Sequence, residues 1–213
     1  MTKQLTGNIA SLLAPPSTWP LLRLTSFKSE PTTLAATMPK ACVIFDTRYG
    51  NTEKIAKSLG SGLERGGITT DCSDIGKVAL ASLGGYDLIC VGGPTQYRTA
   101  SKEMQDFLQS LSSLNLEGKL AFAFDTKRGF VLAGSAAKYI EHALRKRGMR
   151  IVDESQSAII VSPEPEKDKK EFASKDEWKE WKHRSERLRD GEEKRFEEIG
   201  ANLANELLNA MKK

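Results

Sequence analysis

The stretch 43-VIFDTRYGNTEKIAKSL-59 decides the expected fold. An apolar run leads into a polar loop, and apolar residues at four-residue spacing then predict a helix. The loop places the hydroxyls of Thr47 and Thr52 beside the free amides of a helix start, where all of them can point at one anion. Gly50 lets the chain turn tightly. Under the alternative interpretation, Thr52 only caps the helix and Gly50 only turns the chain.

The remaining pattern alternates short apolar runs with helical stretches, which indicates parallel strands joined by crossover helices. We therefore expect an α/β, doubly wound sheet whose ligand site lies beyond the carboxyl ends of the strands. Strands are expected at residues 41–45, 68–72, 88–91, 120–124 and 150–161, the last interrupted by polar residues 153–155. Helices are expected at residues 51–65, 101–111, 136–147 and 192–211.

The opening stretch resembles the FMN-phosphate signature of the flavodoxin family, in the form VIFxTxxGxTxxxAxxL. The similarity continues through 92-GGPTQY-97, 124-FDT-126 and 134-GSAA-137, so it covers nearly all of residues 40–161 and the last helix. The resemblance implies a three-layer sandwich with a five-stranded parallel sheet in the order 2-1-3-4-5. It also implies one non-covalent FMN at the strand ends, in a short-chain flavodoxin-like domain.

By position, the resemblance assigns the phosphate to the first loop (47–52), one face of the flavin ring to the second loop (95–98) and the other face to the third loop, which begins at residues 125–130. Tyr97 is the preferred candidate for stacking on the ring and Phe130 the second, with a core role as the alternative for each. No catalytic residue and no metal ligand is assigned. The expected cofactor-binding residues are Thr47, Arg48, Tyr49, Gly50, Asn51, Thr52, Pro94, Thr95, Gln96, Tyr97, Arg98, Asp125, Thr126, Lys127, Arg128, Gly129 and Phe130.

Composition bounds the function further. The 213 residues carry a formal net charge of +4, which is too small to indicate nucleic-acid binding. No apolar stretch approaches the roughly 20 residues of a membrane helix, so no transmembrane segment is expected. Cys42, Cys72 and Cys90 form no CxxC pair and are interpreted as reduced core thiols, which favours a cytoplasmic location.

Two regions lie outside the family pattern. Residues 1–38 are rich in Ser, Thr and Pro and are expected to be a disordered extension of the domain at 39–213. A transit peptide, or translation starting at Met38, are the alternatives. A charged helical insertion is expected at about 163–190, with Trp178, Trp181, Ser185 and Leu188 on one helical stripe. It is either an extra surface helix or a docking site for a redox partner or membrane surface.

The family resemblance implies an electron carrier that works between a reductase and an acceptor enzyme. The alternative is a flavodoxin-type oxidoreductase that acts on a quinone or porphyrinogen, similar to protoporphyrinogen dehydrogenase. A third hypothesis is a scaffold that has lost its flavin, because Tyr49 replaces a common Thr. Members of the family are typically acidic, whereas these loops carry Arg48, Arg98, Lys127 and Arg128. These cations are expected to ease flavin reduction, unless they only point to solvent.

Overall fold

The computed structural model describes residues 38–162 and 172–212, without the side chain of Val131. Residues 1–37 of the expected extension and residues 163–171 of the expected insertion lie outside this range. The strands are β1 (Lys40–Phe45), β2 (Thr69–Asp74), β3 (Leu88–Gln96), β4 (Thr99–Ala100), β5 (Leu120–Arg128), β6 (Arg150–Ile151), β7 (Gln156–Val161) and β8 (Arg187–Leu188). The α-helices are α1 (Asn51–Arg65), α2 (Lys102–Ser110), α3 (Ala136–Arg145), α4 (Lys175–Arg184) and α5 (Glu192–Met211).

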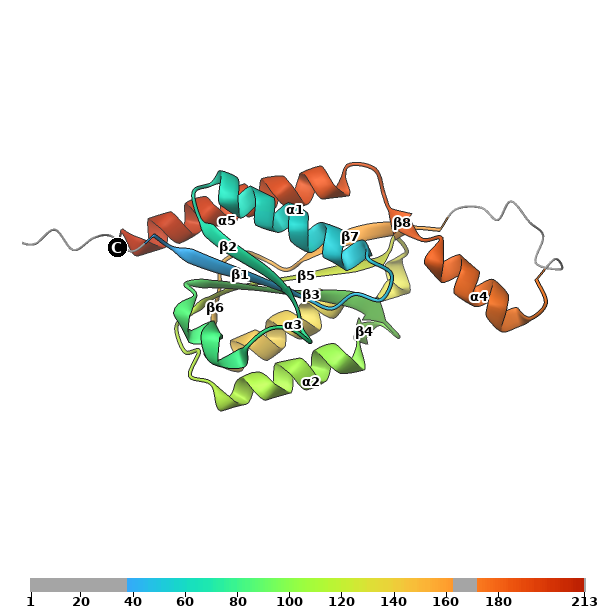
Figure 1. Cartoon of the computed structure of the whole chain (residues 1–213), viewed down its shortest axis with the longest axis horizontal. Helices are drawn as coiled ribbons and strands as arrows, with labels where there is room; N and C mark the ends of the chain where they lie inside the picture. Colours follow the sequence, from blue (N-terminus) through green and yellow to red (C-terminus); the bar gives the residue numbers. More distant parts are fainter. Residues whose placement is uncertain (1–37, 163–171, 213) are drawn as a thin grey trace, which may run out of the picture. The chain divides into compact units, whose positions relative to one another are not determined.

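The sheet confirms the predicted fold class. Its order is β2-β1-β3-β5-β7-β8, and the first five strands pair in parallel, which corresponds to the expected order 2-1-3-4-5. Figure 1 shows α1 and α5 on one face of the sheet and α2 and α3 on the other. Each face has its own apolar cluster, one under α1 and α5 and one under α2 and α3. These are the three layers of a doubly wound sandwich.

The expected fifth strand is divided, as the polar residues 153–155 suggested. Both parts, β6 and β7, pair with β5 in parallel. The sheet also contains an edge strand that the sequence did not predict. This strand, β8, pairs antiparallel with β7. The expected helical stripe through Leu188 was therefore wrong: α4 ends at Arg184, and Leu188 lies in β8, buried in the core.

Two glycines allow α1 and α5 to approach each other closely. A Cβ atom on Gly62 would lie 2.0 Å from the backbone oxygen of Glu197, and one on Gly200 would lie 2.2 Å from that of Leu59. Both distances are far below contact, and the obstacles are backbone atoms that cannot rotate away. The two helices therefore pack backbone against backbone. This packing fixes the position of α1, whose first turn contains the last residues of the first loop.

The three cysteines are free thiols, as expected. Cys42 and Cys90 are buried in β1 and β3, as a core role requires, whereas Cys72 is exposed on β2, so the core role expected for this residue was wrong. Burial raises the pKa of the Cys42 thiol to about 12, so this thiol stays protonated at neutral pH. Within the described residues, no helix has the length and apolar character to span a membrane.

Candidate functional site

The three loops singled out in the sequence meet at the carboxyl ends of β1, β3 and β5. The strands β2 and β3 lie on opposite sides of β1, so the carboxyl end of β1 is at the topological switch point. A cavity of about 380 Å³ opens there. Its walls include all the expected cofactor-binding residues except Gly50, Asp125, Lys127 and Gly129.

The first loop is arranged around the start of α1. Gly50 is the N-cap residue and adopts the left-handed conformation (φ 82°), so no side chain caps the helix. The amides of the first turn consequently have no intrahelical acceptor and remain available to an anion. The hydroxyl of Thr47 accepts the Gly50 amide at 3.0 Å, which holds this oxygen beside the helix start.

Thr52 does not cap the helix, which removes the alternative interpretation of this residue. It lies inside α1, where its buried hydroxyl shares a 2.9 Å hydrogen bond with the hydroxyl of Thr126 on β5. Both threonines line the cavity. A hydroxyl pair can accept and donate at once, so one proton of the pair is available to an anionic ligand oxygen.

The second loop is a tight hairpin between β3 and β4. Gln96 pairs with Thr99, which leaves Tyr97 and Arg98 as a two-residue turn. Both have positive φ, 46° and 73°, the pattern of a type I′ turn that usually contains Asn and Gly. Non-glycine residues in this region store strain, and such strain is often found at functional sites.

The turn carries its side chains to the mouth of the cavity. Tyr97 is 98% exposed, and Phe130 and Leu132 of the third loop are 56% and 67% exposed. Gly134 of the third loop lies directly against Arg98, since a Cβ on Gly134 would lie 2.3 Å from the Arg98 carbonyl oxygen. Large apolar side chains from two adjoining loops therefore surround the cavity mouth. A core role, the alternative for Tyr97 and Phe130, does not fit these exposures.

Asp125 supports the loops from beneath. This carboxylate is fully buried, and its Oδ2 atom accepts hydrogen bonds from the hydroxyls of Thr95 (3.0 Å) and Ser135 (2.8 Å) and from the amide of Ala137 (2.9 Å). It ties the second loop to the start of α3, where negative charge is favourable. Asp125 was expected to face the flavin ring, but it is not among the residues that line the cavity.

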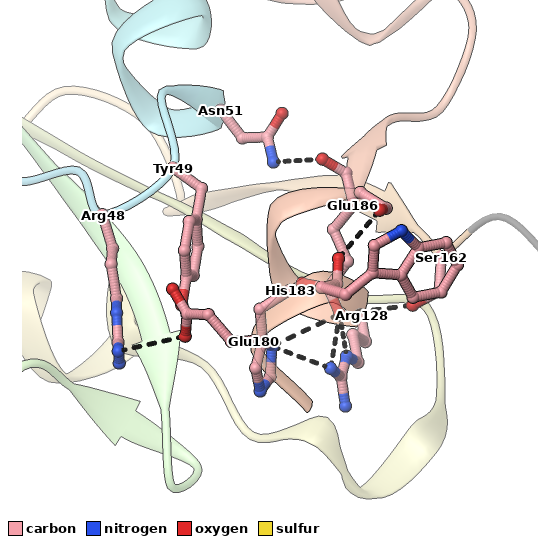
Figure 2. Close-up of polar contacts among 10 residues, drawn as sticks. Arg48, Tyr49, Asn51, Arg128, Ser162, Glu180, His183 and Glu186 are labelled. Atoms are coloured by element: carbon pink, nitrogen blue, oxygen red, sulfur yellow. Dashed lines mark hydrogen bonds and ion pairs between the residues drawn. The ribbon is translucent and has the colours of Figure 1, made fainter. Parts of the chain in front are cut away.

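His183 and Glu186 form a wall of the cavity that the sequence did not predict (Figure 2). The carboxylate of Glu186 accepts a hydrogen bond from Arg128 Nε at 2.8 Å, and His183 Nδ1 lies 3.3 Å from Arg128 Nη2. The carbonyl of Glu186 accepts the Asn51 side-chain amide at 3.0 Å. These contacts join residues 55 to 135 positions apart, and no local sequence pattern signals them.

The same wall changes the interpretation of the basic loops. Arg128 forms an ion pair with Glu186, and Arg48 lies 3.9 Å from Glu180 on α4. Within the described part of the chain, Arg98 and Lys127 have no acidic partner. Among the described residues, two of the four cations are therefore paired with carboxylates and two are not.

The cavity is lined by two kinds of groups. Hydrogen-bonding groups come from the first turn of α1 with Thr47, Thr52 and Thr126, and large exposed side chains come from Tyr97, Phe130 and Leu132. Residues 38–162 and 172–212 contain no cluster of three or more His, Cys, Asp or Glu that could hold a metal. The geometry suits a ligand with a phosphate at one end and a planar ring at the other.

Comparison with known families agrees with this geometry. Residues 42–147 match a family model described as "Flavodoxin domain". The chain is 34% identical over 88 residues to a flavodoxin of Clostridium saccharobutylicum, covering 41% of this chain and 55% of the relative. It is 32% identical over 125 residues to flavodoxin 1 of Salmonella typhimurium, covering 58% of this chain and 66% of the relative. The chain belongs to the flavodoxin family.

Solved structures support the same fold at lower identity. A flavodoxin from the domain Archaea superposes with a TM-score of 0.61 at 22% identity, covering 79% of this chain and 99% of the archaeal one. Flavodoxin 1 of Bacillus cereus gives 0.58 at 21% identity, covering 80% and 97%. The segment with α4 and β8 lies beyond residues 42–147, the part of the chain that the family model matches.

Proposed function

We propose that this chain binds FMN non-covalently and carries electrons between a reductase and an acceptor protein. The observation that supports this most strongly is the start of α1. Its cap is a left-handed glycine, its first-turn amides are free of side-chain acceptors, and Thr47 and Thr52 lie on either side. This donor set fits a phosphomonoester, and the apolar mouth of the same cavity fits a flavin ring.

The proposed roles of the side chains follow from their positions. The first turn of α1, Thr47 and Thr52 bind the phosphate. Tyr97 and Phe130 cover the ring and exclude water from it. Asp125 keeps the two ring-facing loops in register. FMN itself supplies the electron-transfer chemistry, while the protein supplies binding, orientation and electrostatics.

The test is to purify the full chain, remove any bound flavin and titrate it with FMN. Saturable quenching of flavin fluorescence, together with the absorbance bands of oxidised flavin in the complex, is the expected result. A chain that gives neither quenching nor binding heat would contradict the proposal and favour the flavin-free scaffold.

A second candidate is a flavodoxin-type oxidoreductase that acts on a quinone or porphyrinogen. The apolar mouth favours it, because Tyr97, Phe130 and Leu132 expose large surfaces on which a flat apolar substrate could lie. Turnover of menadione or protoporphyrinogen by the purified chain alone would decide for the enzyme. Electron transfer that requires an added reductase would decide for the carrier.

The partners and the location belong to the same proposal. A carrier needs docking surfaces for redox partner proteins, and α4 contributes the half-buried Trp178 and Trp181 to one such surface. The free thiols of Cys42, Cys72 and Cys90 support a reducing compartment such as the cytoplasm.

A further inference from the structure

Positive charge is concentrated on one face of the sheet. Residues 136–150, which form α3, the turn after it and the start of β6, contain five Lys or Arg residues and a single acidic residue, Glu141. The helix α5 contains five Glu residues and two cations. Figure 1 shows α3 and α5 on opposite faces of the sheet. The small net charge of +4 therefore combines a positive α3 with a negative α5.

The cations of α3 lie on its solvent side. Lys138, His142 and Lys146 follow each other at four-residue spacing and are all exposed, whereas the other side of the helix is buried in the apolar cluster under α2 and α3. In the part of the chain that the structure describes, Arg145 forms an ion pair with Glu141, and Lys138 and Lys146 have no acidic partner. The stripe from Lys138 to Lys146 is about 12 Å long.

Two further cations extend this stripe to the cavity. Arg98 lines the cavity and lies against the residue before the N-cap of α3, since a Cβ on Gly134 would lie 2.6 Å from the Cβ of Arg98. Lys127 follows Asp125 by two positions in the regular pairing of β5, so both side chains leave the same face of the sheet. That face is the α3 face, because Asp125 accepts the amide of Ala137. We define the basic face as the surface formed by Arg98, Lys127, Lys138, His142 and Lys146.

Exposed apolar side chains accompany the basic face where it reaches the cavity. Leu132 of the third loop is 67% exposed, and Tyr139 in the first turn of α3 is 42% exposed. Neither side chain is assigned to the flavin ring in the proposed function. Protein interfaces typically combine apolar and aromatic side chains with a polar rim. The basic face and these two side chains therefore have the composition of a docking surface beside the cavity.

We propose that the basic face is the docking site of an acidic redox protein, which it holds beside the mouth of the cavity. The inference rests on the proposed function, because a partner that exchanges electrons with the flavin must approach this mouth. Opposite charges on two proteins raise their association rate and orient their encounter. The same charges repel a partner with a basic surface. The negative α5, on the other face of the sheet, directs an acidic partner toward α3.

The experiment uses cytochrome b5, an acidic haem protein, as the probe and measures its dissociation constant for the full-length protein by isothermal titration calorimetry. For the wild type, this constant should rise at least about tenfold between about 10 mM and about 150 mM NaCl, because salt screens the attraction. At the lower salt concentration, Lys138→Glu/Lys146→Glu should bind the probe at least about tenfold more weakly than the wild type. Lys57→Glu/Lys194→Glu is the matched control, because it changes the net charge equally at two exposed lysines of α1 and α5. It should change the constant less than about twofold.

Cytochrome c, a basic haem protein, should give no saturable heat under the same conditions. Equal binding of the two cytochromes, a dissociation constant that does not depend on salt, or equal losses in the two double variants would overturn the inference. Cosedimentation with phosphatidylserine vesicles, without binding of cytochrome b5, would overturn it in favour of a membrane surface. If circular dichroism shows that Lys138→Glu/Lys146→Glu is unfolded, Lys138→Gln/Lys146→Gln carries the same test.

The flavin titration is a separate measurement, so the two proposals can fail separately. A chain that binds FMN but not cytochrome b5 would remove the inference alone. A chain that binds cytochrome b5 as expected but no FMN would remove the proposed function and leave a docking face for an acidic protein.

Discussion

Replacing Thr52 by Val tests the phosphate end of the cavity most directly. The two side chains have nearly the same shape, so the change removes a hydroxyl and leaves the packing of α1 in place. Thr52 is buried and shares its 2.9 Å hydrogen bond with Thr126, which is also buried. The substitution therefore affects both the free energy of unfolding and the affinity for a phosphate.

The two effects have different expected sizes. The stranded Thr126 hydroxyl should lower the free energy of unfolding by about 1–3 kcal/mol, the cost of a buried polar group without a partner. A hydrogen bond to a charged group contributes about 1.5–3 kcal/mol. Losing it should weaken FMN binding by roughly 10- to 150-fold. Riboflavin, which lacks the phosphate, should lose far less.

Fluorescence titrations with FMN and riboflavin measure the affinities, and urea denaturation measures the stability. Thr70→Val is a matched control on β2. The hydroxyl of Thr70 donates to the carbonyl oxygen of Ile68, two residues earlier in the chain. It removes a hydrogen-bonded hydroxyl away from the cavity and should leave both affinities unchanged. Equal losses for FMN and riboflavin in Thr52→Val would refute the assignment of Thr52 to the phosphate.

Three further predictions concern the scaffold and the charges around the site. Gly62→Ala should lower the free energy of unfolding by about 3 kcal/mol, because the new Cβ meets the Glu197 carbonyl; a stability within 1 kcal/mol of wild type, measured by urea denaturation, would contradict this. Asp125→Ala should lower the free energy of unfolding by about 3 kcal/mol, since three donors lose their acceptor, and Asp125→Asn should lower it clearly less. Equal losses of stability in thermal melts would argue against the role of Asp125 as the acceptor that holds the loops together. Replacing Arg98 and Lys127 together by Gln should make the flavin reduction potential more negative, by an amount that shrinks with added salt; a redox titration without a shift would dismiss the idea.

The main helices and strands could be predicted because their signals are local. The bounds of α1 follow from four-residue spacing that ends at a glycine pair, and α5 follows from the same kind of pattern. The helical spacing also continues past Arg184, but the chain turns there and Leu188 joins the sheet. Periodicity reports which residues are apolar and carries no information on where a helix gives way to an edge strand.

Most of the expected site residues line one cavity, because the carboxyl ends of parallel strands meet at one edge. The positions of His183 and Glu186 could not be predicted, since they depend on long-range contacts with Asn51 and Arg128. The exposed, left-handed conformation of Tyr97 also had no signal, because its sequence is unlike that of a usual type I′ turn.

The Tyr97-Arg98 turn limits how far the thermal stability of the protein can be raised without changing the cavity. Exchanging Tyr97-Arg98 for Asn-Gly would suit the local backbone and should raise the melting temperature. The same exchange would remove from the cavity mouth the almost fully exposed ring of Tyr97 and the charge of Arg98, which has no acidic partner among the described residues. At these two neighbouring positions, the residues that would raise thermal stability are therefore different from those that would favour ligand binding.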